Sequence, residues 1–233
     1  MFKMEKRVII ALTFLLLEPH MAEGSGHLVE IDINHGWEPV FLGFAGIGES
    51  IYDAWVNPFS PVCRLSDGCF TDSSDLTHFG QNKHLRNLMT NHWTLLNVDV
   101  VKLELFLDGH RKVWMIFNGR NTNATNWFSK ENFMKSNYKD LFYDNHFSEF
   151  SIEGEPKTKQ RFIISQSNYG CNVFGWLFVE DGQVCDPYVD HPKYPRISYG
   201  NMDRKTTFGT GTTGTADLMM ISIKQTKLEE ITY

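Results

Sequence analysis

Four cysteines carry the most specific chemistry among the residue types of this chain. They are Cys63, Cys69, Cys171 and Cys185, spaced as C-x5-C and C-x13-C within the two halves. Neither spacing contains the short C-x2-4-C knuckle that is typical of structural zinc sites. An even number of cysteines in an exported chain is typical of disulfides formed in an oxidising compartment. We therefore predict two disulfide bonds and no zinc.

Four cysteines can pair in three ways. We favour Cys63 with Cys69 and Cys171 with Cys185, because the partners are then close in sequence. The second pair also flanks an expected turn at Asp181-Gly182. The sequence leaves the other two connectivities open.

Asn123-Ala124-Thr125 is the one N-x-S/T sequon of the chain, and it lies in a polar segment that follows an apolar run. In an exported protein such a sequon is an acceptor for an N-linked glycan. The sequence therefore predicts glycosylation of Asn123. An unmodified surface turn is the alternative.

Three carboxylates, those of Asp67, Asp72 and Asp75, lie in the segment SDGCFTDSSD. Calcium prefers hard oxygen ligands on loops of this kind. The spacing does not match the twelve-residue loop of helix–loop–helix calcium sites, and Asp and Ser also favour turns. Calcium is thus the one cofactor that the sequence leaves open, and we expect no other.

The motifs that could indicate catalysis or cofactor binding are incomplete or missing. The segment GTGTTG at 209–214 matches G-x-G-x-x-G, but the preceding strand and following helix of a dinucleotide site are absent from the pattern. The sequence contains no G-x-S-x-G nucleophile elbow. The densest histidines, His78, His84 and His92, lack the i, i+4 spacing that places two imidazoles on one helical face. We expect no catalytic, cofactor-binding or metal-binding residue.

Tryptophan rings offer an apolar face and a polar N–H, which suits stacking on sugars. Trp114 and Trp176 lie inside strand-like runs, and we expect them in the core. Trp37, Trp93 and Trp127 lie near turns, and we expect them to be freer to meet a ligand.

The elements that must position these residues are mostly strands. Residues 98–107 and 113–117 are β-rich and flank Asp108-Gly109, which is a strong hairpin signal. Further strands are expected at 160–165, 174–179 and 218–224, the last one half-buried. Residues 128–142 predict one short helix, 41–48 a packed or irregular glycine segment, and 57–75 a loop.

Repeated short strands between glycine and asparagine turns predict a mainly β fold. We expect an antiparallel sandwich or barrel-like domain with at most one or two short helices. A hydrophobic content of 42% is sufficient for a packed core.

The N-terminus begins MFKMEKR and continues with the apolar run Val8–Leu17, followed by small residues around Ala22 and Gly24. This order is typical of a secretory signal peptide, although a buried core helix is the alternative. We expect cleavage after Ala22 or Gly24, so that 1–24 is a signal peptide and 25–233 a single secreted β-rich domain. No later apolar run approaches the length of a membrane span.

The formal net charge is −6. Nucleic acids and anionic lipids require clustered Lys and Arg, so the charge balance argues against both as partners.

Several segments between Trp93 and Tyr199 resemble a known kind of module. They read WTLLNVDVVKLELF, FNGRNTNATNWFS, FSIEG, RFIIS and YGCNVFGWLFVEDGQVC. They resemble a poorly characterised secreted β-rich module of marine invertebrates, found in extracellular and skeletal organic matrix proteins of cnidarians and molluscs. The resemblance implies an extracellular location and carries over no catalytic or ligand residue.

Taken together, these features predict a non-enzymatic, secreted protein of the extracellular matrix or adhesion type, including a component of a mineralised organic matrix. Its expected partners are matrix proteins or glycans. A lectin-like carbohydrate-binding module is the alternative, followed by a secreted hydrolase whose catalytic residues are dispersed in sequence.

Overall fold

The computed structural model describes the backbone of residues 9–12, 27–30, 36–59, 63–64, 83–182, 184, 193–201 and 203–226. Side chains are described in these ranges except 9–12, 27–30 and 63–64.

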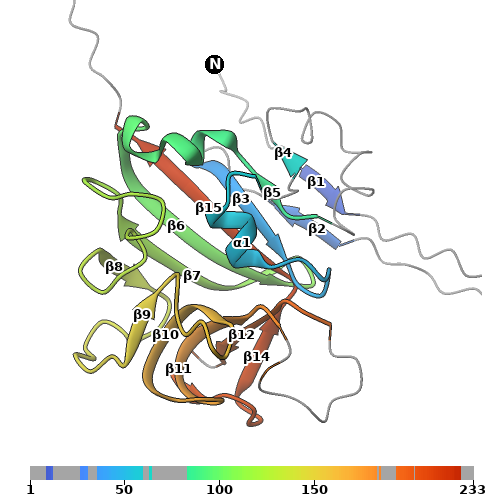
Figure 1. Cartoon of the computed structure of the whole chain (residues 1–233), viewed down its shortest axis with the longest axis vertical. Coiled ribbons are helices and arrows are strands. Elements are labelled where there is room, and N and C mark those ends of the chain that lie inside the picture. The colour runs from blue at the N-terminus through green and yellow to red at the C-terminus, as the bar shows by residue number, and fades with distance from the viewer. Residues whose placement is uncertain are drawn as a thin grey trace, which may run out of the picture.

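Two sheets form the body of the molecule (Figure 1). The seven-stranded sheet has the order β4 (Cys63–Arg64), β5 (Leu85–Arg86), β3 (Glu38–Phe44), β15 (Leu218–Gln225), β6 (Val98–Leu107), β7 (His110–Asn118) and β8 (Phe133–Ser136). The six-stranded sheet has the order β14 (Thr213–Ala216), β12 (Arg196–Gly200), β11 (Asn172–Glu180), β10 (Gln160–Tyr169) and β9 (Glu149–Ser151), with β13 (Thr206–Thr207) beside β11. Among the described strand pairs, only β4 with β5 is parallel.

Two short helices accompany the sheets in the described part of the chain. They are α1 (Ile51–Val56) and the 3-10 helix η3 (Leu88–Leu95). The prediction of a mainly β, antiparallel sandwich with at most two short helices is confirmed. The barrel-like alternative is not, because each sheet remains open.

The β6–β7 hairpin confirms the expectation from Asp108-Gly109. Both turn residues have positive φ, 52° for Asp108 and 73° for Gly109. This left-handed pair matches the right-handed twist of the flanking strands, which is why Asp-Gly is favoured there.

Strand β15 differs from its expected half-buried state. Every residue from Leu218 to Ile223 is buried, on both faces of the strand. The reason is its position between β3 and β6 in the middle of the seven-stranded sheet. The alternating pattern of residues 218–224 therefore does not indicate a solvent-facing side of β15.

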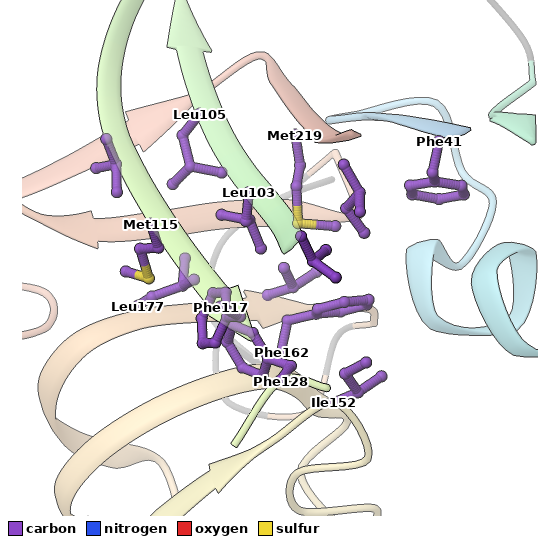
Figure 2. Close-up of a cluster of buried hydrophobic side chains, with 14 of the residues drawn as sticks. Phe41, Leu103, Leu105, Met115, Phe117, Phe128, Ile152, Phe162, Leu177 and Met219 are labelled. Atoms are coloured by element: carbon purple, nitrogen blue, oxygen red, sulfur yellow. The ribbon is translucent and has the colours of Figure 1, made fainter. Parts of the chain in front are cut away.

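The core lies between the two sheets. One cluster of buried side chains joins residues of both, including Leu103 of β6, Phe117 of β7 and Leu177 of β11. Figure 2 shows Met115 and Phe117 close to Leu177, Phe162 and Phe128 in this layer. Apolar burial on this scale is the main source of stability for the fold.

The helix expected at 128–142 is wrong. Residues 133–136 form β8, which pairs with β7, and turns precede and follow it. The rings of Phe128 and Phe133 both pack against Phe117 and Phe150. This packing on the sandwich overrides the weak helical pattern, which carries helix-unfavourable asparagines.

The glycine segment 41–48 is also not irregular throughout. Its first residues belong to β3, where Gly43 lies tightly against Phe41 and Ile51. A side chain at position 43 would collide with these groups, so this glycine allows α1 to approach the strand closely.

The expected turn at Asp181 serves another purpose. The carboxylate of Asp181 accepts hydrogen bonds from Ser50 Oγ at 2.7 Å, Ile51 N at 2.9 Å and Tyr52 N at 2.9 Å. It therefore caps the start of α1 from the end of β11. Burial raises the pKa of Asp181, and these hydrogen bonds oppose that rise.

The predicted signal region contains a strand. Strand β1 (Ile9–Leu12) pairs with β2 (His27–Glu30) in a separate two-stranded sheet. Cleavage after residue 22 or 24 would separate the two strands, and the signal peptide stays a prediction.

Candidate functional site

Residues 139–148, between β8 and β9, form a surface loop that we call the aromatic loop. Phe142 and Tyr143 are 58% and 81% exposed. Their rings contact each other edge to face, with centroids 5.5 Å apart. Leu141 of the same loop is fully buried, so the loop is attached to the core on one side and presents two rings on the other.

A cleft of about 500 Å³ lies beside these rings. It is lined by Asp140, Tyr143, Asp144, Asn145, His146 and Gln166, which all carry polar groups, although about half of the lining surface is apolar. Gln166 comes from β10, so the cleft lies between the aromatic loop and the six-stranded sheet.

Asp144 is the best-connected carboxylate of the cleft. Its Oδ2 lies 2.6 Å from Lys205 Nζ and accepts a hydrogen bond from Gln166 Nε2 at 3.2 Å, while Oδ1 accepts one from His146 N at 2.9 Å. Burial alone would raise the pKa of Asp144, but the contacts with Lys205 and His146 outweigh it and lower the pKa. Asp144 is therefore an ionised, oriented acceptor.

Asp140 fixes the other end of the loop. Its Oδ1 accepts a hydrogen bond from Trp176 Nε1 at 2.7 Å, and its Oδ2 accepts one from Lys205 N at 3.1 Å. The ammonium of Lys205 also lies 5.4 Å from the Trp176 ring centroid. The indole of Trp176 is fully buried, so the loop is held by a group of the core.

This arrangement suits recognition of a sugar. An exposed ring provides an apolar surface for stacking, and a fixed carboxylate with neighbouring amides provides oriented hydrogen bonds to hydroxyls. Within the described ranges, no group of three or more His, Cys, Asp or Glu residues could hold a metal ion. The calcium candidates Asp67, Asp72 and Asp75 lie outside the described residues.

The sequon lies in a second loop, residues 119–127, which we call the sequon loop. Asn123 and Thr125 are both exposed. Asn123 Oδ1 accepts hydrogen bonds from Thr125 N, Thr125 Oγ1 and Asn126 N, each at 2.9 Å. Its Nδ2, the atom that a glycan would modify, takes part in none of these bonds.

Buried tryptophans hold the sequon loop in place. Ala124 O accepts hydrogen bonds from Trp55 Nε1 at 2.7 Å and from Trp127 Nε1 at 3.1 Å. Thr122 Oγ1 accepts one from Trp93 Nε1 at 3.0 Å. The three indoles also pack on one another. They therefore combine a core role with positioning of the loop.

The tryptophans differ from expectation. Trp93 and Trp127 are buried and do not face solvent, contrary to their proximity to turns. Trp176 is in the core as expected, but Trp114 is half-buried. Trp37 is half-buried between Lys102 Nζ and Lys224 Nζ, each 4.7 Å from its ring centroid. Trp93 and Trp127 lie near turns but point inward, because the N–H of each indole donates to an oxygen of the sequon loop, Thr122 Oγ1 and Ala124 O respectively.

The exposed rings of the aromatic loop were missed from the sequence. Their signal is two consecutive aromatics between two aspartates, in DLFYD at 140–144. One of two consecutive residues usually faces inward, so the sequence alone does not show that both rings are exposed.

A wider cleft of about 740 Å³ lies beside the sequon loop. It is lined by Trp93, Thr94, Asn97, Val98, Gly119, Arg120, Asn121, Thr122 and Thr226. Arg120 in this lining forms an ion pair with Asp99. A glycan on Asn123 would start two residues from Asn121 and crowd this cleft, so the aromatic loop is the better candidate.

Of the four cysteines, only Cys171 has a described side chain. Cys171 is disulfide-bonded, and the side chains of the other three cysteines are not among those described. The pairing with Cys185 and the bond between Cys63 and Cys69 therefore stay predictions.

Residues 209–212 of the glycine–threonine segment form the turn between β13 and β14, and Thr213 and Gly214 begin β14, whereas the sequence predicts a loop that enters the last strand. The hydroxyls of Thr206 and Thr212 bond each other, and Thr210 Oγ1 lies 3.0 Å from Thr212 Oγ1. These hydroxyls satisfy one another.

No family model matches the chain, and the searches found neither a curated protein nor a solved structure similar to it. The resemblance to invertebrate matrix modules therefore stays a prediction. In the part of the chain that the structure covers, no helix has the length and apolarity needed to cross a membrane.

Proposed function

We propose that this protein is a secreted, non-enzymatic binding module of the extracellular matrix or adhesion type, and that it attaches to glycans through the aromatic loop. The observation that carries the proposal is the pair of exposed rings, Phe142 and Tyr143, beside a cleft with an ionised, oriented carboxylate.

The exposed rings favour a contact role. Large apolar side chains that face water singly are common, but two adjacent rings beside a polar cleft form a defined patch. An aromatic ring buries roughly 150–250 Å² when fully covered, which makes such rings effective anchors. A sugar ring stacked on Tyr143 would cover part of this area.

The cleft has hydrogen-bonding groups left over for the hydroxyl groups of a sugar. A carboxylate has about four acceptor sites. Asp144 uses three of them, for Lys205, Gln166 and His146. The remaining site, together with the amide of Asn145, supplies oriented partners for a sugar that stacks on the neighbouring ring.

A glycan array with purified, glycosylated protein of residues 25–233 tests the proposal. We expect saturable binding to a subset of glycans, about 5- to 30-fold weaker in Tyr143→Ala, since loss of one stacking ring is worth roughly 1–2 kcal/mol. Tyr169→Ala is the matched control, because Tyr169 is 80% exposed but lies at the β10–β11 hairpin. Equal binding by all three proteins would contradict a role for the aromatic loop.

Two further measurements test the calcium and the hydrolase alternatives. Repeating the array with a chelator tests calcium, and loss of binding would assign a role to an ion.

A panel of glycan, ester and peptide substrates tests the hydrolase alternative. Saturable turnover that one Asp, His or Ser substitution abolishes without unfolding would overturn the non-enzymatic proposal.

Secretion and the disulfides have their own tests. N-terminal sequencing of the exported protein should find Glu23 or Ser25 as the first residue. An intact Met1 on exported protein would contradict secretion by this route. Non-reducing peptide mapping should join Cys171 to Cys185. A link between Cys63 and Cys171 would reject this connectivity.

A further inference from the structure

Arg86, at the end of β5, is a buried cation without a compensating anion among the described residues. Only 3% of its surface is exposed. Its Nε has no hydrogen-bond partner, and no carboxylate among the described residues pairs with its guanidinium. Burial lowers the pKa of Arg86, and no neighbouring acid opposes this effect.

Its position in the sheet directs the side chain inward. Arg86 is in register with Phe41 of β3, and register partners share one face of a sheet. Phe41 belongs to the core cluster between the sheets. His84, two residues earlier, has its pKa lowered by burial to about 4 and is neutral at pH 7. The described surroundings of Arg86 are thus apolar or uncharged.

A second arginine adjoins this position. β4 pairs with β5 in parallel, and Arg64 is the register partner of Arg86. Two arginine residues therefore occupy neighbouring backbone positions at the edge of the seven-stranded sheet.

A guanidinium does not lose its proton in a protein, so burial cannot be relieved by neutralisation. A buried charge without a partner is strongly unfavourable. The geometry points to a bound oxyanion: we propose that Arg86 forms a site for one phosphate, sulfate or carboxylate group. The unpaired Nε–H and an adjacent Nη–H form the fork that such a group accepts from.

This site is separate from the aromatic loop. Figure 1 shows β5 beside β3 and β4, away from β8 and β9, which flank that loop. Failure of glycan binding would therefore leave the oxyanion site untouched, and the reverse also holds.

Thermal unfolding with inorganic phosphate as the probe tests the proposal. Chloride replaces phosphate at constant ionic strength in the reference series. We expect the Tm of the wild-type protein to rise by about 3–6 °C for each tenfold increase of phosphate above its Kd. Sulfate and acetate series rank the oxyanions, and a sulfated monosaccharide shows whether a group carried by a larger ligand also enters.

Arg86→Met should abolish the phosphate dependence. The control is Arg120→Met, which removes the same charge from a side chain that is 67% exposed and should keep the dependence. Arg86→Lys keeps the charge without the planar fork and should bind phosphate at least tenfold more weakly. If Arg86→Met does not fold, this lysine variant provides the comparison.

Two results would overturn the proposal. The first is a wild-type Tm that responds to phosphate no more than to chloride, which would mean that the chain itself neutralises Arg86. The second is an unchanged phosphate response in the Arg86 variants. Isothermal titration of phosphate into the wild-type protein should give a stoichiometry of about one if the site is real.

Discussion

The sequon loop and the aromatic loop flank the same short strand, β8, yet they are built in opposite ways. In the sequon loop, acceptors at Thr122 and Ala124 receive hydrogen bonds from buried indoles, and no large apolar side chain of the loop is left exposed. In the aromatic loop, carboxylates of the loop receive hydrogen bonds from the sheet, while Phe142 and Tyr143 face water.

The difference separates rings used for stability from rings available for contact. The rings of Trp55, Trp93 and Trp127 each have partners on more than one side and a bonded N–H. Those of Phe142 and Tyr143 have only each other among the described ring contacts. Substitutions should therefore change the free energy of unfolding in one region and ligand binding in the other.

The largest effect should come from Trp127→Ala. Trp127 is fully buried and contacts Trp55, Trp93, Phe117 and Phe128. Its removal leaves a large cavity and should lower the free energy of unfolding by about 3–5 kcal/mol. Urea unfolding followed by circular dichroism measures it. A loss below about 1 kcal/mol would remove the contrast between the loops.

The second-largest effect should come from low pH, which should lower the free energy of unfolding through His84, near Trp55. His84 Nδ1 accepts a hydrogen bond from Phe44 N, so Nε2 carries the proton and donates to Glu49 O. The His84 ring also lies against Phe41, which in turn contacts Trp55. Burial lowers the pKa of His84 from 6.5 to about 4.

The sign follows from proton uptake. Between pH 4 and 6.5 the unfolded chain binds more protons at this histidine than the folded protein does. Stability is therefore full above about pH 6.5 and falls as the pH drops towards 4, by about 3 kcal/mol in total. Urea midpoints at several pH values measure this slope, and His84→Gln should flatten it. An unchanged slope in that variant would assign it to other groups.

The aromatic loop should respond only at lower pH. The pKa of Asp144 is lowered, so its contact with Lys205 contributes above the ordinary pKa of 3.8 and is lost as the pH falls below it. Glycan binding by the His84→Gln variant should therefore persist at pH 5. Loss of binding there, with the fold intact, would show that another titrating group controls the loop.

A smaller stability effect is expected for Asp140→Ala. This change removes the acceptor of the buried Trp176 Nε1 and should lower the free energy of unfolding by about 1–3 kcal/mol. Asp140→Asn keeps an acceptor oxygen and should lose less. Equal losses in the two variants would indicate that charge, rather than the indole hydrogen bond, holds the loop.

The smallest stability effect should come from Tyr143→Ala, within about 0.5 kcal/mol, because the ring is mostly exposed. The same variant should give the largest loss of glycan binding. A destabilisation above about 1 kcal/mol would mean that the ring is structural, and the two loops would then not differ in the proposed way.

Local signals in the sequence determined the strands and their hairpin. Alternation in 98–107, the Asp108-Gly109 turn and the run at 174–179 each depend on neighbouring residues. The structure has strands β6 and β11 at the two runs and a hairpin turn at Asp108-Gly109. The mainly β class follows from such signals because period and turn chemistry are local properties. The sequon Asn123-Ala124-Thr125 is another local feature that the sequence supplies, and the structure adds that Asn123 is exposed.

Only the tertiary structure decided which side chains are buried, paired or exposed. Asp181 caps α1 from a position 130 residues further along the chain, and Trp93 and Trp127 turn inward to bond the sequon loop. The exposed pair in the aromatic loop and the lone guanidinium of Arg86 likewise depend on residues distant in sequence. Which strands pair in the sheets decides which side chains are buried and which polar groups find hydrogen-bond partners. The pairing of strands that are distant in sequence leaves no local pattern in a single sequence.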